Sequence, residues 1–243
     1  MSVWVMADLH LSFGRPKPMD RFGTRWTDHA AKIGARWRAV VRDGDTVAVP
    51  GDISWADTLE EAAEDFAFLD ALPGRKLLGK GNHDYWWTSV TKMKRFFLDR
   101  GFGTLDFLYN NAHEAEGIVL AGSRGWFLDE RQQTVIPADY GKLVNRECER
   151  LSLSLAAAEK LRASGGIGDP PTVFLHFPPV YGEFRLDPLV DVMEAHGVKR
   201  CYAGHVHGQY GVPPYSDYRG IRFYNAAADY LNFYPLPVLL TEG

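Results

Sequence analysis

The sequence predicts an α/β fold with mixed β-sheets, and two observations carry this prediction. Short apolar runs typical of buried strands alternate with helical patterns in the first half of the chain. After residue 198 the pattern contains strands with short loops and no long helix. The 243 residues fit one domain spanning positions 1–243, and a content of 46% hydrophobic and 24% charged residues excludes disordered, collagen-like and coiled-coil chains.

The strands and helices follow from apolar periodicity and turn signals. Seven apolar or β-branched runs, each followed by a turn signal, predict strands over residues 3–7, 46–49, 76–78, 118–121, 172–175, 199–203 and 222–225. Apolar residues at helical spacing predict helices over residues 27–41, 58–72, 89–99 and 139–163. The last helix is expected to stop at Gly165 and Gly166. Beyond residue 198 the short loops favour antiparallel pairing in place of helical crossovers.

The charge balance and the cysteine content limit the partners and the location. With 27 Lys and Arg residues against 31 Asp and Glu residues, the net charge is −4, which argues against a nucleic-acid partner. Cys148 and Cys201 are too few for a disulfide framework, so a cytoplasmic protein is expected. The N-terminus shows no export signal, and no apolar stretch approaches the roughly 18 to 20 residues that cross a bilayer. We therefore expect no membrane partner, and the sequence leaves the oligomeric state open.

Acids, histidines and one asparagine directly follow five of the predicted strands. They are Asp8 with His10, Asp52, Asn82 with His83 and Asp84, His176, and His205 with His207. Ligands of open α/β sheets bind at the carboxyl ends of strands, so these distant residues are expected to meet in one site. A lone histidine is more often structural than a ligand. Here, however, five of the eight histidines follow apolar strands, and we assign structural roles to the other three, His29, His113 and His196.

The residue types at this expected site indicate a metal centre. Imidazole and carboxylate ligands together suit Mn, Fe, Co, Ni or Zn better than an all-oxygen Mg or Ca cage. No cysteine joins the set, which argues against a structural zinc site. We therefore expect an open, catalytic centre.

The same residues carry a resemblance to a known family. The ordered series Asp8-x-His10, Gly51-Asp52, Gly81-Asn82-His83-Asp84, His176 and Gly204-His205-x-His207 resembles the full motif set of the calcineurin-like metallophosphoesterases. The stretches 8–25, 50–55 and 81–87 also resemble a small bacterial branch of predicted phosphohydrolases. The resemblance implies a four-layer α/β/β/α sandwich of two mixed β-sheets, with two divalent metal ions at the sheet ends.

The resemblance also implies a role for each residue. Asp8, His10 and His207 match the ligands of one metal, Asn82, His176 and His205 match those of the other, and Asp52 matches the bridging carboxylate. In protein phosphatases the second motif continues as Asp-Arg-Gly. Here Ile53 follows Asp52, which argues against a phosphoserine or phosphothreonine phosphatase.

The chemistry expected of such a centre is hydrolysis at phosphorus. Two cations roughly 3.5 to 4 Å apart can generate hydroxide at neutral pH and hold the attacking and leaving oxygens of an in-line displacement. His83 matches no metal position, so its imidazole is free to protonate the leaving group or to stabilise phosphoryl oxygens. We expect Asp84 to hold the His83 ring in place and to favour its protonated form.

Other motifs carry weaker signals. Residues 74–81 spell the first seven positions of a phosphate-binding P-loop, but a glycine stands where Ser or Thr must hold Mg, and Lys76 falls inside a predicted strand. Arg124 is a candidate phosphate ligand, although a charged hairpin tip is the more common role. Trp55, Tyr85, Trp86 and Trp87 either stack against a substrate ring or, more commonly, belong to the core. The basic residues of segment 11–25 predict a solvated surface loop.

The leading functional hypothesis is a metal-dependent phosphoesterase. It would hydrolyse a small phosphomonoester or phosphodiester by attack of a dimetal-bound hydroxide on phosphorus. A nucleotide-lipid pyrophosphatase is the first alternative, and members of that kind carry Arg where His83 stands. A nuclease is disfavoured by the acidic charge balance. A non-catalytic scaffold of the same fold would lack ligand positions, whereas every position is filled here.

Overall fold

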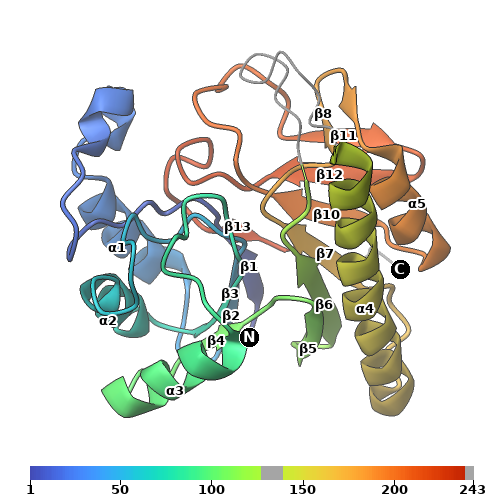
Figure 1. Ribbon diagram of the computed structural model, residues 1–243, viewed down its shortest axis with the longest axis horizontal. Helices are drawn as coiled ribbons and strands as arrows, with labels where there is room; N and C mark the ends of the chain where they lie inside the picture. The colour runs from blue at the N-terminus through green and yellow to red at the C-terminus, as the bar shows by residue number, and fades with distance from the viewer. Residues whose placement is uncertain (127–138, 239–243) are drawn as a thin grey trace.

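Two β-sheets form the centre of the computed structural model, which describes residues 1–126 and 139–238 (Figure 1). The first sheet has the order β13 (Leu236–Pro237), β1 (Val3–Val5), β2 (Thr46–Val49), β3 (Arg75–Leu78), β4 (Leu105–Phe107). The second has the order β11 (Tyr215–Tyr218), β12 (Ile221–Asn225), β10 (Arg200–Ala203), β7 (Thr172–Leu175), β6 (Ile118–Ser123), β5 (Asn111–Ala115). The strands inside each sheet are parallel, whereas β13, β11 and β5 pair antiparallel at the edges. Both sheets are therefore mixed.

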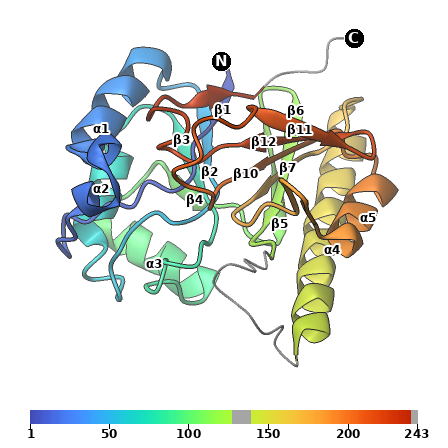
Figure 2. The same ribbon diagram turned by 90° about the horizontal axis from the view of Figure 1, so that it is seen from above.

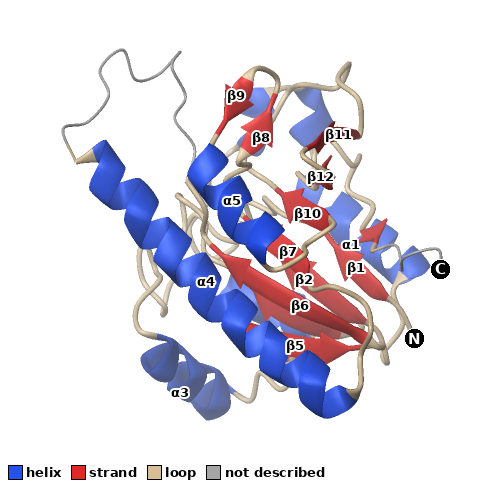
Figure 3. Ribbon diagram, turned by 90° about the vertical axis from the view of Figure 1, so that its right-hand side faces the viewer, coloured by secondary structure: helices blue, strands red, loops and turns tan. Residues whose placement is uncertain are grey.

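Helices cover the outer face of each sheet. Helices α1 (His29–Val40), α2 (Ala63–Asp70) and α3 (Val90–Arg100) lie on the first sheet, and α4 (Tyr140–Gly165) and α5 (Asp187–Ala195) lie on the second (Figure 2). Figure 3 shows α4 running across β5 and β6. The remaining elements are short: η1 (Met19–Phe22), η2 (Thr24–Trp26) and the hairpin of β8 (Val180–Tyr181) and β9 (Phe184–Arg185). The α/β/β/α sandwich implied by the sequence is confirmed.

The layers follow from alternation along the strands. In β2, Val47 and Val49 join the core under α1 and α2, whereas Ala48 between them faces the second sheet. A strand turns successive side chains to opposite faces, so an unbroken apolar run suits a strand buried on both sides. On α4, Leu151 and Leu155 are fully buried four residues apart, at the spacing that places apolar side chains on one helix face.

The seven predicted strands and four predicted helices all form, with three differences. The helix expected from residue 58 begins at Ala63, because turns occupy residues 57–62. Helix α5 and the short strands β4, β5, β8, β9, β11 and β13 carry too little periodicity to be predicted. The expectation of antiparallel pairing after residue 198 is right for β11 with β12. It is wrong for β10 with β12, which are parallel because β11 reverses the chain direction before β12 inserts between β10 and β11. None of the described helices is long and apolar enough to cross a membrane.

Candidate metal centre

The loops that carry the predicted ligands meet at the carboxyl ends of both sheets. Asp8 and His10 follow β1, Asp52 follows β2, Asn82 follows β3, His176 follows β7, and His205 and His207 follow β10. Backbone hydrogen bonds tie the loops together: the amide of Asp8 donates to the Gly51 carbonyl at 2.9 Å, and the amide of Gly204 donates to the His176 carbonyl at 3.1 Å. The parallel strands thus bring residues nearly 200 positions apart to one edge.

One group of donors is formed by Asp8, His10 and His207. The Nε2 atoms of His10 and His207 lie 3.2 Å apart. Nε2 of His207 also lies 3.5 Å from Oδ1 of Asp8. All three residues place a ligand atom within 4.8 Å of the others, which is the spacing of donors around one ion.

A second group surrounds His176. Its Nε2 lies 2.7 Å from Oδ1 of Asn82 and 3.6 Å from Oδ2 of Asp52. The same oxygen of Asp52 lies 3.7 Å from Nε2 of His10, so this carboxylate stands between the two groups. His205 joins through its backbone amide, which donates to the Asp8 carboxylate at 2.9 Å, and its ring centroid is 5.2 Å from that of His176.

Burial shifts the pKa of the acids and of the histidines in this group in opposite directions. Asp8, Asp52, His10 and His176 are each at most 3% exposed. Burial raises the pKa of the Asp8 and Asp52 carboxyls, the latter helped by Asp84 and Asp8, and it lowers the pKa of His10 and His176. A metal needs charged carboxylates and neutral imidazoles. A bound ion lowers the pKa of the acids again, and the lowered pKa of His10 and His176 already favours the neutral rings that bind it. This oxygen and nitrogen set fits borderline divalent ions.

The backbone at the centre is held in an uncommon conformation. Asp8, His10, Asp52 and His205 have φ values of 60°, 47°, 52° and 71°, in the left-handed region that residues other than glycine rarely adopt. Such strain persists where the surrounding structure imposes it, which is frequent at functional sites. The loops also approach closely, because a Cβ added at Gly81 would collide with the Asp52 carboxylate.

Asp84 differs from the expectation that it would orient the His83 ring. Its carboxylate accepts from the backbone amides of Gly81 at 2.7 Å, Asp52 at 2.8 Å and Ile53 at 2.8 Å, and from Nε1 of Trp86 at 3.1 Å. A buried carboxylate surrounded by amides fixes the two loops after β2 and β3 relative to each other. Asp84 is therefore a positioning residue for the backbone.

His83 lies at the edge of the donor cluster as a neutral imidazole. Its amide donates to Oδ1 of Asp52 at 2.8 Å, and its ring lies 5.6 Å from that of His10 and 4.3 Å from that of Trp55. Burial, followed by the charges of Lys17 and His207, lowers the pKa of His83 to about 4. The expected protonated form is thus disfavoured. A neutral ring can still donate one hydrogen bond.

Comparison with known proteins agrees with this geometry. The family model of calcineurin-like phosphoesterases matches residues 1–209. The chain belongs to the calcineurin-like phosphoesterase family. Among solved structures it is similar to a protein of unknown function from Aquifex aeolicus (17% identity, TM-score 0.51, covering 97% of this chain and 95% of the other). It is also similar to phosphopantetheinyl hydrolase PptH from Mycobacterium tuberculosis (14% identity, TM-score 0.51, covering 99% and 96%). No curated protein matches the chain.

A further carboxylate contacts one of the candidate ligands of the phosphoesterase and was not predicted from the sequence. Asp229 is fully buried, and its Oδ1 lies 2.9 Å from Nδ1 of His207, while its Oδ2 accepts from the Gly208 amide at 2.9 Å and the Tyr210 hydroxyl at 3.0 Å. Burial alone would lower the pKa of His207, but Asp8 and Asp229 raise it to about 10. A carboxylate on the far nitrogen orients a ligating imidazole. The available signal was the position of Asp229 four residues after β12, at the same sheet edge.

Arg124 lies beside the centre. It follows β6, and its carbonyl accepts from the His176 amide at 3.1 Å, so it is not at a hairpin tip. Its Nε is buried and has no hydrogen-bond partner within residues 1–126 and 139–238. Arg124 also contributes to the lowered pKa of His176, after burial and His205. Its position is consistent with contact to a bound anion.

The other sequence candidates divide between core and surface. Trp86 is buried and Trp87 packs against the same core, whereas Tyr85 is 61% exposed. Trp55 is different, because its ring stacks on the ring of His10 at 4.8 Å. The apparent P-loop is structural: Lys76 lies in β3 and its ammonium donates to the carbonyls of Leu72 and Gly74, at 2.6 and 2.8 Å.

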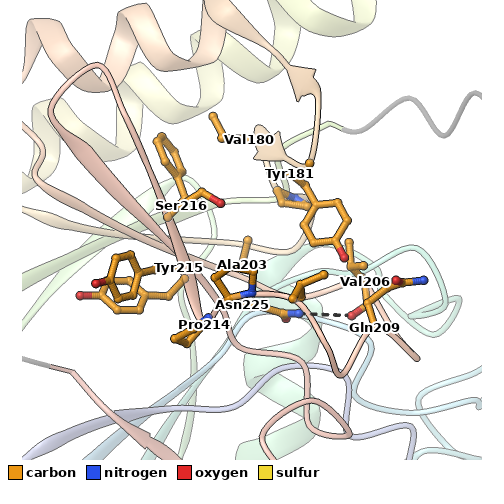
Figure 4. Close-up of a pocket in the computed structure, with 16 residues that line it drawn as sticks. Val180, Tyr181, Ala203, Val206, Gln209, Pro214, Tyr215, Ser216 and Asn225 are labelled. Carbon is orange, nitrogen blue, oxygen red and sulfur yellow. Dashed lines mark hydrogen bonds between the residues drawn. The ribbon is translucent and has the colours of Figure 1, made fainter.

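An uncharged pocket adjoins the loop that carries His205 (Figure 4). Its volume is about 290 Å³, and its walls include Gly204 and Val206 on either side of His205, together with Tyr215. None of the 16 lining residues is charged, although 24% of the chain is. Nδ2 of Asn225 donates to the Val206 carbonyl at 3.5 Å. The pocket beside the loop of His205 is thus lined by uncharged residues.

Proposed function

We propose that this phosphoesterase is a dinuclear metal-dependent hydrolase of small phosphomonoesters or phosphodiesters. The observation that carries the proposal is the position of Oδ2 of Asp52, 3.7 Å from Nε2 of His10 and 3.6 Å from Nε2 of His176. A shared carboxylate between two histidine-containing groups is the arrangement that two ions require. The family match over residues 1–209 supports the same chemistry.

The chain's own residues would divide the work as follows. Asp8, His10 and His207 would hold one ion, Asn82, His176 and His205 the other, and Asp52 both. The ions, drawn from Mn, Fe, Co, Ni and Zn, would supply positive charge at the phosphoryl group and activate water. His83 would donate a hydrogen bond to a phosphoryl oxygen, since its lowered pKa keeps the ring neutral at pH 7.

Arg124 would complete the substrate site. Its guanidinium lies 5.1 Å from the centroid of Phe177 and presents a planar set of donors that matches phosphate oxygens. The negative net charge argues against nucleic acid and leaves a small phosphate ester as the expected substrate, and the low cysteine content makes the cytoplasm the expected compartment.

The test is metal analysis combined with an activity panel. Purified protein reconstituted with Mn, and in parallel with the other candidate ions, should release p-nitrophenol from p-nitrophenyl phosphate or bis(p-nitrophenyl) phosphate. Metal analysis should find close to two ions per chain. Protein that binds metal but hydrolyses nothing in a panel of nucleotides, cyclic nucleotides, sugar phosphates and artificial diesters would support the non-catalytic scaffold. Absence of bound metal together with absence of activity in every assay would refute the proposal.

A further inference from the structure

The basic loop 11–25 places one cation near the metal centre. Nζ of Lys17 lies 2.9 Å from the centroid of the Trp55 ring. That ring stacks on His10 at 4.8 Å and lies 4.3 Å from the ring of His83. The ammonium group, a predicted ligand and His83 therefore all pack against the same indole ring.

Lys17 has no anionic partner in the described parts of the chain. Its neighbour in the loop, Arg15, forms an ion pair with Asp57, whereas the contacts of the Lys17 ammonium are the rings of Trp55 and, at 5.8 Å, Phe22. An ammonium over an aromatic face keeps its three hydrogen-bond donors, because the ring offers electron density and no lone pair. These donors remain available to a ligand.

The carboxylates around the centre, in contrast, are already engaged. Asp84 and Asp229 accept three or more hydrogen bonds each, and the Asp8 carboxylate accepts from the His205 amide. On the side of the second sheet, Arg124 adds a cation that forms no ion pair with any residue in 1–126 or 139–238. Two cations that form no ion pair within the described residues thus lie beside the centre.

We propose that Lys17 is a specificity-determining residue that binds the terminal phosphoryl oxygens of the substrate, so that the site favours a phosphomonoester dianion over a phosphodiester monoanion. This inference rests on the proposed hydrolase function and names its substrate class. A dianion carries one more negative charge than a diester and gains more from each unpaired cation. A charge-assisted hydrogen bond of this kind corresponds to about 10- to 100-fold in binding.

The competing interpretation is structural. Lys17 could serve only to hold loop 11–25 against Trp55, since cation–π contacts stabilise many surface loops. Loss of such a contact would disturb the site equally for every substrate. Loss of a phosphate ligand would instead act mainly on the dianion.

The experiment compares three variants of the full-length, metal-reconstituted protein. Lys17→Met removes the charge and keeps the length of the side chain, Lys17→Arg restores a cation, and Arg21→Met removes an exposed charge from the same loop. We would measure kcat and KM for p-nitrophenyl phosphate and bis(p-nitrophenyl) phosphate, competitive inhibition by inorganic phosphate, and the thermal melting temperature as a check of folding.

The expected result is a split between the two esters. Lys17→Met should lower kcat/KM for the monoester about 10- to 100-fold, mainly through KM, and weaken inhibition by phosphate by a similar factor. Its effect on the diester should stay within about 3-fold, Lys17→Arg should recover most of the loss, and Arg21→Met should match the wild type.

Three outcomes would overturn the inference while leaving the hydrolase function intact. They are equal losses for both esters, no loss for either ester, and a wild-type preference for the diester. If the wild type hydrolyses neither ester and nothing in the wider substrate panel, the proposed function fails separately. Calorimetric titration of the metal-loaded protein with inorganic phosphate then still tests the role of Lys17, because unchanged phosphate affinity in Lys17→Met would refute that role.

Discussion

The two ends of the same sheets bury polar side chains in different ways. At the amino ends, Lys76 donates to the carbonyls of Leu72 and Gly74, and Asp45 accepts from the amides of Ser2 and Arg42 at 2.7 and 2.9 Å. At the carboxyl ends, ionisable side chains face one another, as the Nε2 atoms of His10 and His207 do at 3.2 Å.

The difference shows that burial of a polar group does not by itself indicate function. A buried polar group with complementary protein partners stabilises the fold, because its hydrogen bonds within the protein compensate for the loss of its contacts with water. Carboxylate oxygens and imidazole nitrogens that gather around one point, as those of Asp8, His10 and His207 do, are atoms that can bind a cation. The contrast predicts that substitutions at the carboxyl ends act on metal and activity, whereas those at the amino ends act on stability.

The largest effect is expected at the centre of the site. Asp52→Asn should lose metal and reduce activity by more than about 10³-fold, since the bridging charge between two cations disappears. His83→Ala should keep both metals and lose about 10²- to 10³-fold in kcat, the magnitude of one hydrogen-bond donor at a reacting group. Metal analysis of the two variants beside steady-state kinetics makes the comparison. Equal metal loss in both would contradict the assignment of His83 to catalysis.

Much of the fold was predictable because its strands are strongly apolar. Runs such as 46–49 and 172–175 are buried on both faces, and in each a single β-branched threonine is followed by three apolar residues. Strand β5 was not predictable, because it is an edge strand of mixed polarity from Asn111 to Ala115. The pairing of β10 with β12 is set by tertiary packing, which local periodicity in the sequence does not report.

The meeting of the candidate ligands could be predicted where they directly follow strands, and the remaining contacts of the candidate site depended on folding geometry. Asp8 and His176 could be placed by their positions after β1 and β7 alone. Asp229 could not be linked to His207, because only the folded chain brings the two within 2.9 Å. The role of Asp84 was misjudged for a similar reason: neighbours in sequence suggested a contact with His83, but the carboxylate turns to the backbone amides of the loops.

A smaller effect is expected one step away from the metal, at Asp229. Asp229→Asn weakens the acceptor for Nδ1 of His207, and loss of such an orienting partner lowers metal affinity by about 10- to 100-fold. Competition with a fluorescent chelator would measure it. Tyr210→Phe is the matched control, because it removes one donor to Asp229 and leaves the carboxylate in place. An Asp229→Asn variant with wild-type metal affinity would show that His207 is held by packing alone.

The smallest effect on activity is expected at the amino ends, where Asp45 serves the comparison best. Asp45→Ala leaves the donors of Ser2, Trp4 and Arg42 without their acceptor and should lower the free energy of unfolding by about 1–3 kcal/mol, with metal content and kcat unchanged. Burial raises the pKa of Asp45, but the hydrogen bonds together outweigh burial and lower the pKa below its ordinary value of 3.8. A lowered carboxyl pKa means that the stabilisation is complete above that value and is lost as the pH falls through the folded-state pKa. Urea unfolding at pH 7 and near pH 3 should therefore show the wild type and Asp45→Ala converging in acid. A constant difference between them, or a loss of activity at pH 7, would break the division between the two ends of the sheets.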